Sequence, residues 1–290
     1  MIWNIKMLAQ LLTTLVFSVS LTTTVYASEA VAMITDLTGN ASLTSNGEQK
    51  KCEILMSTFS GDEIRVEANS KLTLVYFKSA KEYTFAENSV FKVNTEAPEN
   101  KSGANATTRD LEVAKNTKLL TDENEYSQAA ILFRGTRNKS KIKLVSPVNS
   151  KILSSQPMFE WQPLEGDLQY RFVLTDDSGR TVIETLVNGT NFKLPPENRI
   201  VDSSLYSWQV EARLSTGAVY SNSTSFSLID KGELEKINRL RPKDEATFSE
   251  RIVFAMLLEQ MGVRDEARSY WKTLSAERPD NKLLKGKAKE

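Results

Sequence analysis

The sequence predicts a mainly β protein with two β units and a C-terminal α-helical hairpin. Apolar and polar residues alternate through residues 30–95 and again through residues 142–229, and turn-forming residues interrupt both stretches at short intervals. Residues 231–290 instead repeat their apolar positions with the spacing of an amphipathic helix. The 290 residues suffice for about two or three domains of ordinary size. We therefore divide the chain into residues 1–27, 28–95, 96–141, 142–229 and 230–290.

The composition excludes several kinds of chemistry. Lysine and arginine number 37, aspartate and glutamate also number 37, and this neutral balance gives no electrostatic reason to expect a nucleic-acid partner. The absence of histidine excludes Ser-His-Asp and Cys-His catalysis and imidazole metal ligands. The single cysteine, Cys52, excludes an intrachain disulfide and a cysteine-cluster metal site. The composition predicts a soluble, globular protein that is not an enzyme and holds no cofactor.

The first 27 residues have the three parts of a secretory signal peptide. Lys6 precedes an apolar run over residues 7–25, and Val25 and Ala27 form a small-x-small ending. We expect cleavage after Ala27 and a periplasmic or secreted mature chain without a transmembrane segment. The alternative is a retained N-terminal anchor helix. A chain of this size without a disulfide favours a bacterial envelope over eukaryotic secretion.

Residues 28–95 are predicted to form a small all-β unit. Its short β-branched and aromatic runs are separated by turn signals such as Asn46-Gly47. The order of these pieces resembles the FecR domain, a periplasmic β module. The resemblance is carried by residues 36–39 (Asp-Leu-Thr-Gly), 59–64 (Phe-Ser-Gly-Asp-Glu-Ile), 72–75 (Leu-Thr-Leu-Val) and 85–90 (Phe-Ala-Glu-Asn-Ser-Val). Residues 78–81 depart from it, because the family has an Asp-Gly turn there.

The FecR resemblance also bears on function. In that family the domain is the periplasmic sensing part of membrane regulators that control sigma factors. The chain lacks the cytoplasmic segment and the transmembrane helix that such a role needs, so the signalling role is not transferred to it. The resemblance implies recognition of a protein or an envelope polymer instead.

Residues 96–141 are predicted to be a linker with possible extra strands. Residues 96–109 contain no large apolar residue and are expected to be a loop. Leu111, Val113, Leu119 and Leu120 are candidates for a short strand pair, and residues 126–133 for a strand or a helical turn. The basic stretch 134–141 is interpreted as a solvated linker, with an anionic-polymer patch as the alternative.

Residues 142–229 are predicted to form a β-sandwich. Each strand alternates apolar with polar residues, as a sheet with one buried and one solvated face requires. Trp161 and Trp208 are expected in the core, and stacking on a carbohydrate is the alternative. The unit resembles a bacterial fibronectin type III or immunoglobulin-like module. The resemblance is carried by residues 146–147 (Ser-Pro), 159–161 (Phe-Glu-Trp), 170–174 (Tyr-Arg-Phe-Val-Leu) and 206–210 (Tyr-Ser-Trp-Gln-Val).

Residues 230–290 are predicted to be helical. A short helix ends before Pro242, a capping box at residues 247–250 opens a helix over 248–261, and Gly262 ends it. A second helix over 265–277 ends before Pro279, and the charged tail 282–290 is expected to fray. The spacing is similar to that of one tetratricopeptide repeat. The resembling positions are Gly262, Ala267, Trp271, Leu274 and Pro279.

The hairpin also supplies the candidate partner-binding site. Its apolar residues present more surface than two short helices can hide between themselves. We expect the remainder to lie against the preceding sandwich, a second copy of the chain or another protein. The candidate residues are Phe254, Leu257, Leu258, Met261, Tyr270 and Trp271.

Carboxylate pairs occur at predicted turns and helix starts, where they satisfy backbone donors. Residues 176–179 (Asp-Asp-Ser-Gly) are interpreted as a β-turn, with a Ca²⁺ site as the alternative. Cys52 follows two lysines, which can lower a thiol pKa, but it is interpreted as a lone strand residue. The sequence therefore predicts an exported, non-catalytic, modular binding or scaffold protein of the bacterial cell envelope. The alternatives are a periplasmic accessory of a FecR-type transmembrane signalling system and an envelope carbohydrate-active enzyme.

Overall fold

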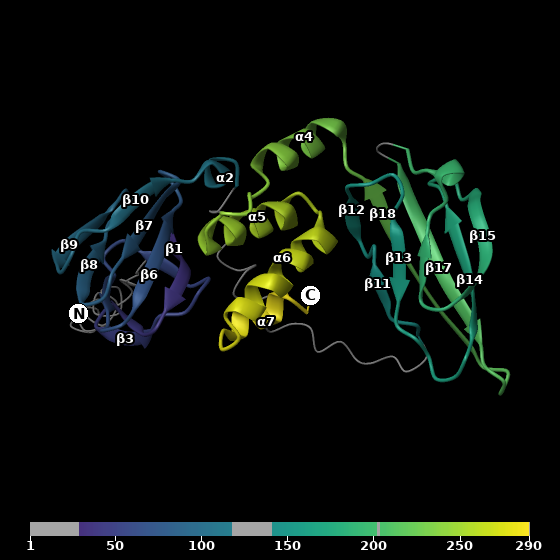
Figure 1. Cartoon of the computed structure of the whole chain (residues 1–290), viewed down its shortest axis with the longest axis horizontal. Coiled ribbons are helices and arrows are strands. Elements are labelled where there is room, and N and C mark those ends of the chain that lie inside the picture. Colours follow the sequence, from purple (N-terminus) through teal and green to yellow (C-terminus); the bar gives the residue numbers. More distant parts are fainter. Residues whose placement is uncertain (1–28, 118–140, 202–203, 290) are drawn as a thin grey trace, which may run out of the picture.

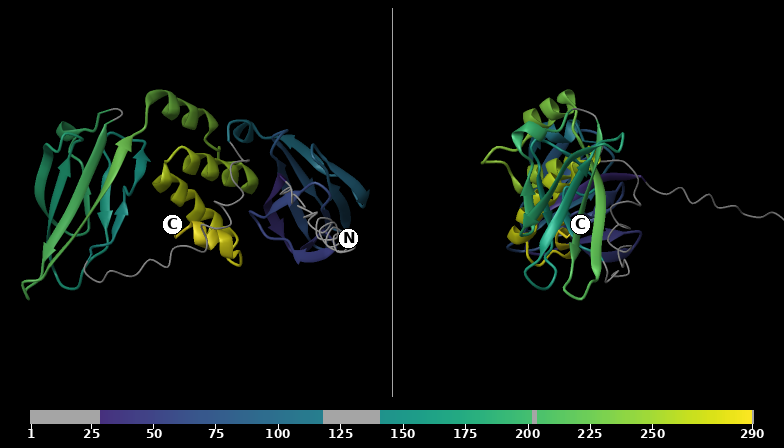
Figure 2. Two further views of the ribbon diagram at one scale, coloured as in Figure 1. Left: turned by 180° about the vertical axis from the view of Figure 1, so that it is seen from behind. Right: turned by 90° about the vertical axis from the view of Figure 1, so that its right-hand side faces the viewer.

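The computed structural model describes residues 29–117, 141–201 and 204–289. An N-terminal β unit and a β-sandwich lie at opposite ends of the molecule, and the C-terminal helices lie between them (Figure 1). The reverse view in Figure 2 shows the same order. The predicted fold class, mainly β with C-terminal helices, is confirmed. The predicted signal peptide lies outside the described residues.

The N-terminal β unit consists of two five-stranded antiparallel sheets with the orders β10-β7-β6-β1-β4 and β3-β2-β5-β8-β9. Side chains between the sheets form its inner core, in which Phe85 and Phe91 stack. The strands are β1 (Ala30–Thr38), β2 (Ala41–Ser45), β3 (Glu48–Lys51), β4 (Ser57–Phe59), β5 (Glu63–Val66), β6 (Lys71–Tyr76), β7 (Lys81–Phe85), β8 (Ser89–Val93), β9 (Pro98–Ser102) and β10 (Thr107–Asp110).

Two turns of the N-terminal β unit contain residues with a positive φ. Asn46 and Gly47 both adopt positive φ, at 50° and 83°, as the two-residue turn between β2 and β3 requires. Residues 77–80 connect β6 to β7 without the Asp-Gly turn typical of the FecR family, and Ala80 takes a φ of 52° there.

The prediction of a loop over residues 96–109 is wrong. Strands β9 and β10 pair with β8 and β7 and so complete both N-terminal sheets. Their residues are almost all exposed, so these edge strands carry no apolar alternation that could have marked them. Leu111 and Val113 were expected in a strand, but they lie at the start of a short helix, α2 (Glu112–Lys115). Leu119, Leu120 and residues 126–133 lie outside the described residues, as do residues 134–140.

Residues 142–229 form a β-sandwich, as expected. A three-stranded sheet, β11-β13-β16, faces a five-stranded sheet, β12-β18-β17-β14-β15. All pairs are antiparallel except β12 with β18. The strands are β11 (Leu144–Ser146), β12 (Ser150–Ile152), β13 (Met158–Trp161), β14 (Gln169–Thr175), β15 (Thr181–Asn188), β16 (Asn191–Lys193), β17 (Leu205–Arg213) and β18 (Val219–Leu228), with the 3-10 helix η1 (Pro196–Asn198) after β16.

The C-terminal region forms α4 (Lys231–Leu240), α5 (Phe248–Gln260), α6 (Arg264–Glu277) and α7 (Lys282–Lys287). Thr247 caps α5 by accepting a hydrogen bond from the Glu250 N–H at 3.2 Å, and Gly262 follows α5 with a φ of 78°. These features confirm the predicted helices. The expected fraying of residues 282–290 is wrong for α7, because Asn281 caps this helix and Leu284 is buried.

In the described part of the chain, the buried apolar side chains form three cores. One lies inside the N-terminal β unit and one inside the sandwich. The third, which we call the shared core, combines the outer face of β1 and β6 with α2 and the C-terminal helices. Its β-unit members include Met33, Ile54 and Val75, and its helical members include Val253 and Phe254. The N-terminal β unit and the helices are therefore one packed body, although more than a hundred residues separate them in sequence.

Candidate functional site

The six predicted partner-binding residues lie in or against the shared core. Phe254, Leu257, Leu258 and Trp271 are buried within the chain, while Met261 and Tyr270 are half-buried and pack against the same core. Outside the hairpin itself, α5 is covered by the N-terminal β unit and α2, which was not among the expected surfaces. In this arrangement only Met261 and Tyr270 keep exposed surface, and partner binding by these six residues stays a prediction.

Helix α5 is apolar on all sides, and this explains its central place. A helix of this kind has to be covered all round rather than along one stripe. Its neighbours include α6, α2 and β1. Nine of its residues are buried: Phe248, Ser249, Ile252, Val253, Phe254, Ala255, Met256, Leu257 and Leu258.

Polar contacts fix α5 and α6 on the N-terminal β unit. The Arg278 guanidinium binds both oxygens of Asp36, at 2.9 and 3.2 Å, and lies over the Phe248 ring at 4.4 Å from its centroid. Arg109 of β10 donates to the Thr247 hydroxyl at 2.7 Å, and Thr35 is hydrogen-bonded to Ser249 in the buried interface. These directional contacts fix the orientation of α5 and α6 on the N-terminal β unit, which apolar packing alone does not specify.

A second set of contacts, the hook, joins the helices to the sandwich. The Lys151 N–H donates to the Gly262 carbonyl at 2.8 Å, and the Ser150 hydroxyl accepts from the Arg264 N–H at 3.0 Å at the start of α6. The Lys151 ammonium lies 2.6 Å from the Glu233 carboxylate. Ser146 donates to Asp265, and burial raises the pKa of that carboxyl. The hook is polar, in contrast with the apolar shared core, and nothing in the sequence pattern marked its residues.

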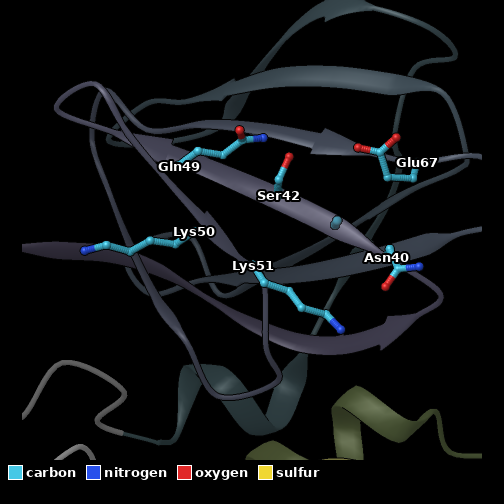
Figure 3. Close-up of a pocket in the computed structure, with 7 residues that line it drawn as sticks. Asn40, Ser42, Gln49, Lys50, Lys51 and Glu67 are labelled. Atoms are coloured by element: carbon cyan, nitrogen blue, oxygen red, sulfur yellow. The ribbon is translucent and has the colours of Figure 1, made fainter.

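A shallow pocket of about 390 Å³ lies on β2 and β3, on the exposed side of the N-terminal β unit. In Figure 3, Lys50 and Lys51 extend in opposite directions, and Ser42 lies between Gln49 and Glu67. Ser42 pairs with Lys51 on one side and with Arg65 on the other, so one row of this sheet carries a hydroxyl between two cations. Such a row can bind hydroxyl, carboxylate or phosphate groups. The lysines also protect the edge strand β3 from pairing with other strands.

Cys52, next to this pocket, is not an activated thiol. Its side chain is buried in the inner core of the N-terminal β unit. Burial and the nearby Asp62 carboxylate raise the pKa of the thiol to about 12, which opposes any lowering by Lys50 and Lys51. Cys52 is thus a buried core residue, although it lies directly after β3 and not within a strand as expected.

The carboxylate pair in the sandwich serves a turn, as expected. The Gly179 N–H donates to the Asp176 carbonyl at 3.0 Å, and the Asp176 carboxylate accepts from the N–H groups of Ser178 and Arg180. The Ser178 hydroxyl also donates to this carboxylate, at 2.6 Å, and this bond together with those from Arg180 lowers the pKa of Asp176. Within residues 29–117, 141–201 and 204–289, no group of three or more His, Cys, Asp or Glu side chains is placed to hold a metal ion.

Both sandwich tryptophans are core residues. Trp208 is 1% exposed, and its indole N–H donates to the Pro147 carbonyl at 2.8 Å. Trp161 is buried beside Tyr170, at 5.5 Å between ring centroids. Neither ring is available for stacking on a carbohydrate in this arrangement.

No protein-family model matches the chain, and no curated protein matches it. Among solved structures, CopC from Methylosinus trichosporium OB3b is 12% identical over 30% of this chain and 92% of that chain, with a TM-score of 0.24. A tetra-tandem repeat in the extending region of a large adhesion protein is 10% identical over 70% of this chain and 42% of that one, with a TM-score of 0.22. A two-domain fibronectin type III segment of chicken tenascin is 12% identical over 69% and 94%, with a TM-score of 0.23.

These likenesses are low, and the assignment of the sandwich rests on the strand order of the chain itself. The resemblances of the N-terminal β unit to the FecR domain and of the hairpin to a tetratricopeptide repeat stay predictions. None of the helices in the described part of the chain has both the length and the apolar character needed to cross a bilayer.

Proposed function

We propose that the chain is an exported, non-catalytic scaffold of the bacterial cell envelope that binds a protein or an envelope polymer. One observation carries the proposal: a single helical layer fastens two β modules, one through the shared core and the other through the hook. A protein that acts by presenting two modules at a fixed separation needs such a layer. The N-terminal sequence pattern supports export.

Within this proposal, the β2–β3 pocket is the place where the ligand binds. Lys50, Lys51, Asn40 and Gln49 line it, and among the described residues Lys51 forms no ion pair that would have to be broken. The only described ion pair of Lys50 is with Glu48 at 3.6 Å, and both side chains are exposed, so it contributes little stability. The pocket is shallow, which suits the side of an extended polymer or a protein surface better than a small enclosed molecule.

Export is testable at residue resolution. We expect the mature chain to begin at Ser28 and to occur in the periplasmic or secreted fraction, because Val25 and Ala27 form the cleavage signal. N-terminal sequencing of the product checks this. Ala27→Gln should block processing, whereas Glu29→Gln should leave it intact. A membrane-bound product that keeps Met1 would show instead that the segment is an anchor.

Binding is tested with the immobilised mature chain, residues 28–290, in envelope extract and in purified peptidoglycan. We expect retention of one protein or polymer, and a loss of about tenfold in affinity for Lys50→Gln/Lys51→Gln, which corresponds to about 1.4 kcal/mol. Lys71→Gln is the matched control, since Lys71 is an exposed strand lysine that does not line the pocket. If the Lys50→Gln/Lys51→Gln variant retained the ligand as well as the unmodified chain does, the binding site would lie elsewhere on the protein. Cleavage of a glycan by the pure chain would contradict a non-catalytic role and favour the carbohydrate-active alternative.

A further inference from the structure

Edge strands are where a β protein is open to pairing with another strand, and natural proteins usually protect them. Seven of the eight edge strands of the described sheets are short, at three to five residues. Most also carry a lysine, an arginine or a proline, as Lys50 and Lys51 do in β3, Pro98 and Lys101 in β9, and Lys193 in β16.

Strand β15 is the exception. It has eight residues, Thr-Val-Ile-Glu-Thr-Leu-Val-Asn, with no lysine, arginine or proline. One edge pairs with β14 along its length, and no described strand pairs with the other. Leu186 is 61% exposed, more than the other large apolar residues described as exposed. Asn198 binds the Val182 carbonyl at 3.2 Å, so the unprotected part of the edge is residues 184–188.

The position of β15 in the molecule leaves it accessible. It forms the outer edge of the sandwich, at the end of the molecule away from the helices and from the N-terminal β unit (Figure 1). A long, partly apolar free edge without lysine, arginine or proline at that place is a feature that would cause aggregation unless a specific strand covers it.

We propose that two copies of the chain pair antiparallel through β15, with Leu186 of one copy opposite Leu186 of the other. This two-fold register places Val187 opposite Thr185 and Glu184 opposite Asn188, so apolar residues meet and no like charges oppose. A register centred on Glu184 would set two carboxylates against each other. The Glu184 carboxylate is instead already held by Arg171 of its own copy at 2.7 Å, which keeps it away from the pairing edge.

The inference goes beyond the proposed function. The joined five-stranded sheets become one continuous sheet across both copies, and the two N-terminal β units end up at opposite ends of the dimer. Each β2–β3 pocket then stays accessible, so the dimer is bivalent for whatever ligand the pockets take.

The test is the mass of the full mature chain in solution, measured by analytical ultracentrifugation over a range of concentrations. We expect twice the monomer mass for the unmodified chain and half that value for Leu186→Lys, which places a lysine on the edge as in β3 and β9. Leu205→Lys is the matched control, because Leu205 is also an exposed apolar residue, at 54%, but lies on β17 inside the sheet. This control should keep the dimer mass.

A second variant, a cysteine at position 186, tests the same pairing without introducing the lysine charge. Leu186→Cys should form a disulfide-linked dimer under copper-phenanthroline oxidation, whereas Leu205→Cys should not, and the buried Cys52 should stay reduced in both. A chain that is monomeric at every concentration, or a dimer that survives Leu186→Lys, would overturn the proposal. Slow amide exchange at residues 184–188 in a monomer would also overturn it, since another segment of the same chain would then cover the edge.

Discussion

Phe254→Ala should lower the free energy of unfolding of the N-terminal β unit and the helices together by about 3–5 kcal/mol. Phe254 is fully buried at the centre of the shared core, where its ring meets Tyr270 edge-on at 5.1 Å between centroids. Its removal leaves a cavity beside α6 and weakens the layer that covers the outer face of β1 and β6. Because that face contains Met33 and Val75, the N-terminal sheet loses stability although the substitution is more than 170 residues away from it.

The measurement is urea unfolding combined with amide hydrogen exchange. Exchange should quicken in β1 and β6 and in the helices but not in the sandwich, which has its own core. Tyr270→Phe is the matched control on the same ring pair, since it keeps the aromatic contact and removes only the hydroxyl of this half-buried side chain, with its contact to Arg241. Unchanged exchange in β1 and β6 would show that the N-terminal β unit and the helices do not fold as one body.

Trp208→Ala should have the opposite distribution of effects, with a loss of about 3–5 kcal/mol confined to the sandwich. Trp208 packs against Phe159 at 5.2 Å between ring centroids and donates its indole N–H to the Pro147 carbonyl. The alanine variant loses this packing and leaves a buried carbonyl without its donor. A loss of this size is a large part of the stability of an ordinary domain.

Tryptophan fluorescence can follow the unfolding of the sandwich separately from that of the N-terminal β unit and the helices. In a Trp271→Phe background the remaining tryptophans of the mature chain, Trp161 and Trp208, both report on the sandwich. Their emission should be blue-shifted and poorly quenched by iodide, and Trp208→Ala should shift the unfolding transition that they report. Free quenching of both rings, together with unchanged stability of the alanine variant, would support a carbohydrate-stacking role instead.

The two predictions together describe how the chain is assembled. The N-terminal β unit and the helices share a core, and the sandwich lies between them in the sequence and is attached through the polar hook. Its contacts with the helices include hydrogen bonds and ion pairs such as Lys151 with Glu233, which weaken with salt more than apolar packing does. The position of the sandwich is therefore more sensitive to conditions than its internal fold.

Local pattern determined much of the architecture. The strands of the sandwich follow from alternation, because each of them has one face in the core around Trp161 and Trp208. The limits of α4 and α5 follow from Asp230, Thr247 and Gly262, whose capping and turn geometry depends on residues within one helical turn. The turn at Asp176 could likewise be predicted, because residues within the turn itself decide it.

Only the tertiary structure decided what the apolar faces pack against. The sequence shows that α5 is too apolar to remain uncovered. It does not show which distant segment covers α5, because apolar packing is non-directional and depends on shape and apolarity alone. That segment is the N-terminal β unit, and Arg278 with Asp36 and Arg109 with Thr247 fix the orientation. Strands β9 and β10 were missed for a related reason: an edge strand solvated on both faces has no periodicity, and backbone pairing with β8 and β7 alone makes it a strand.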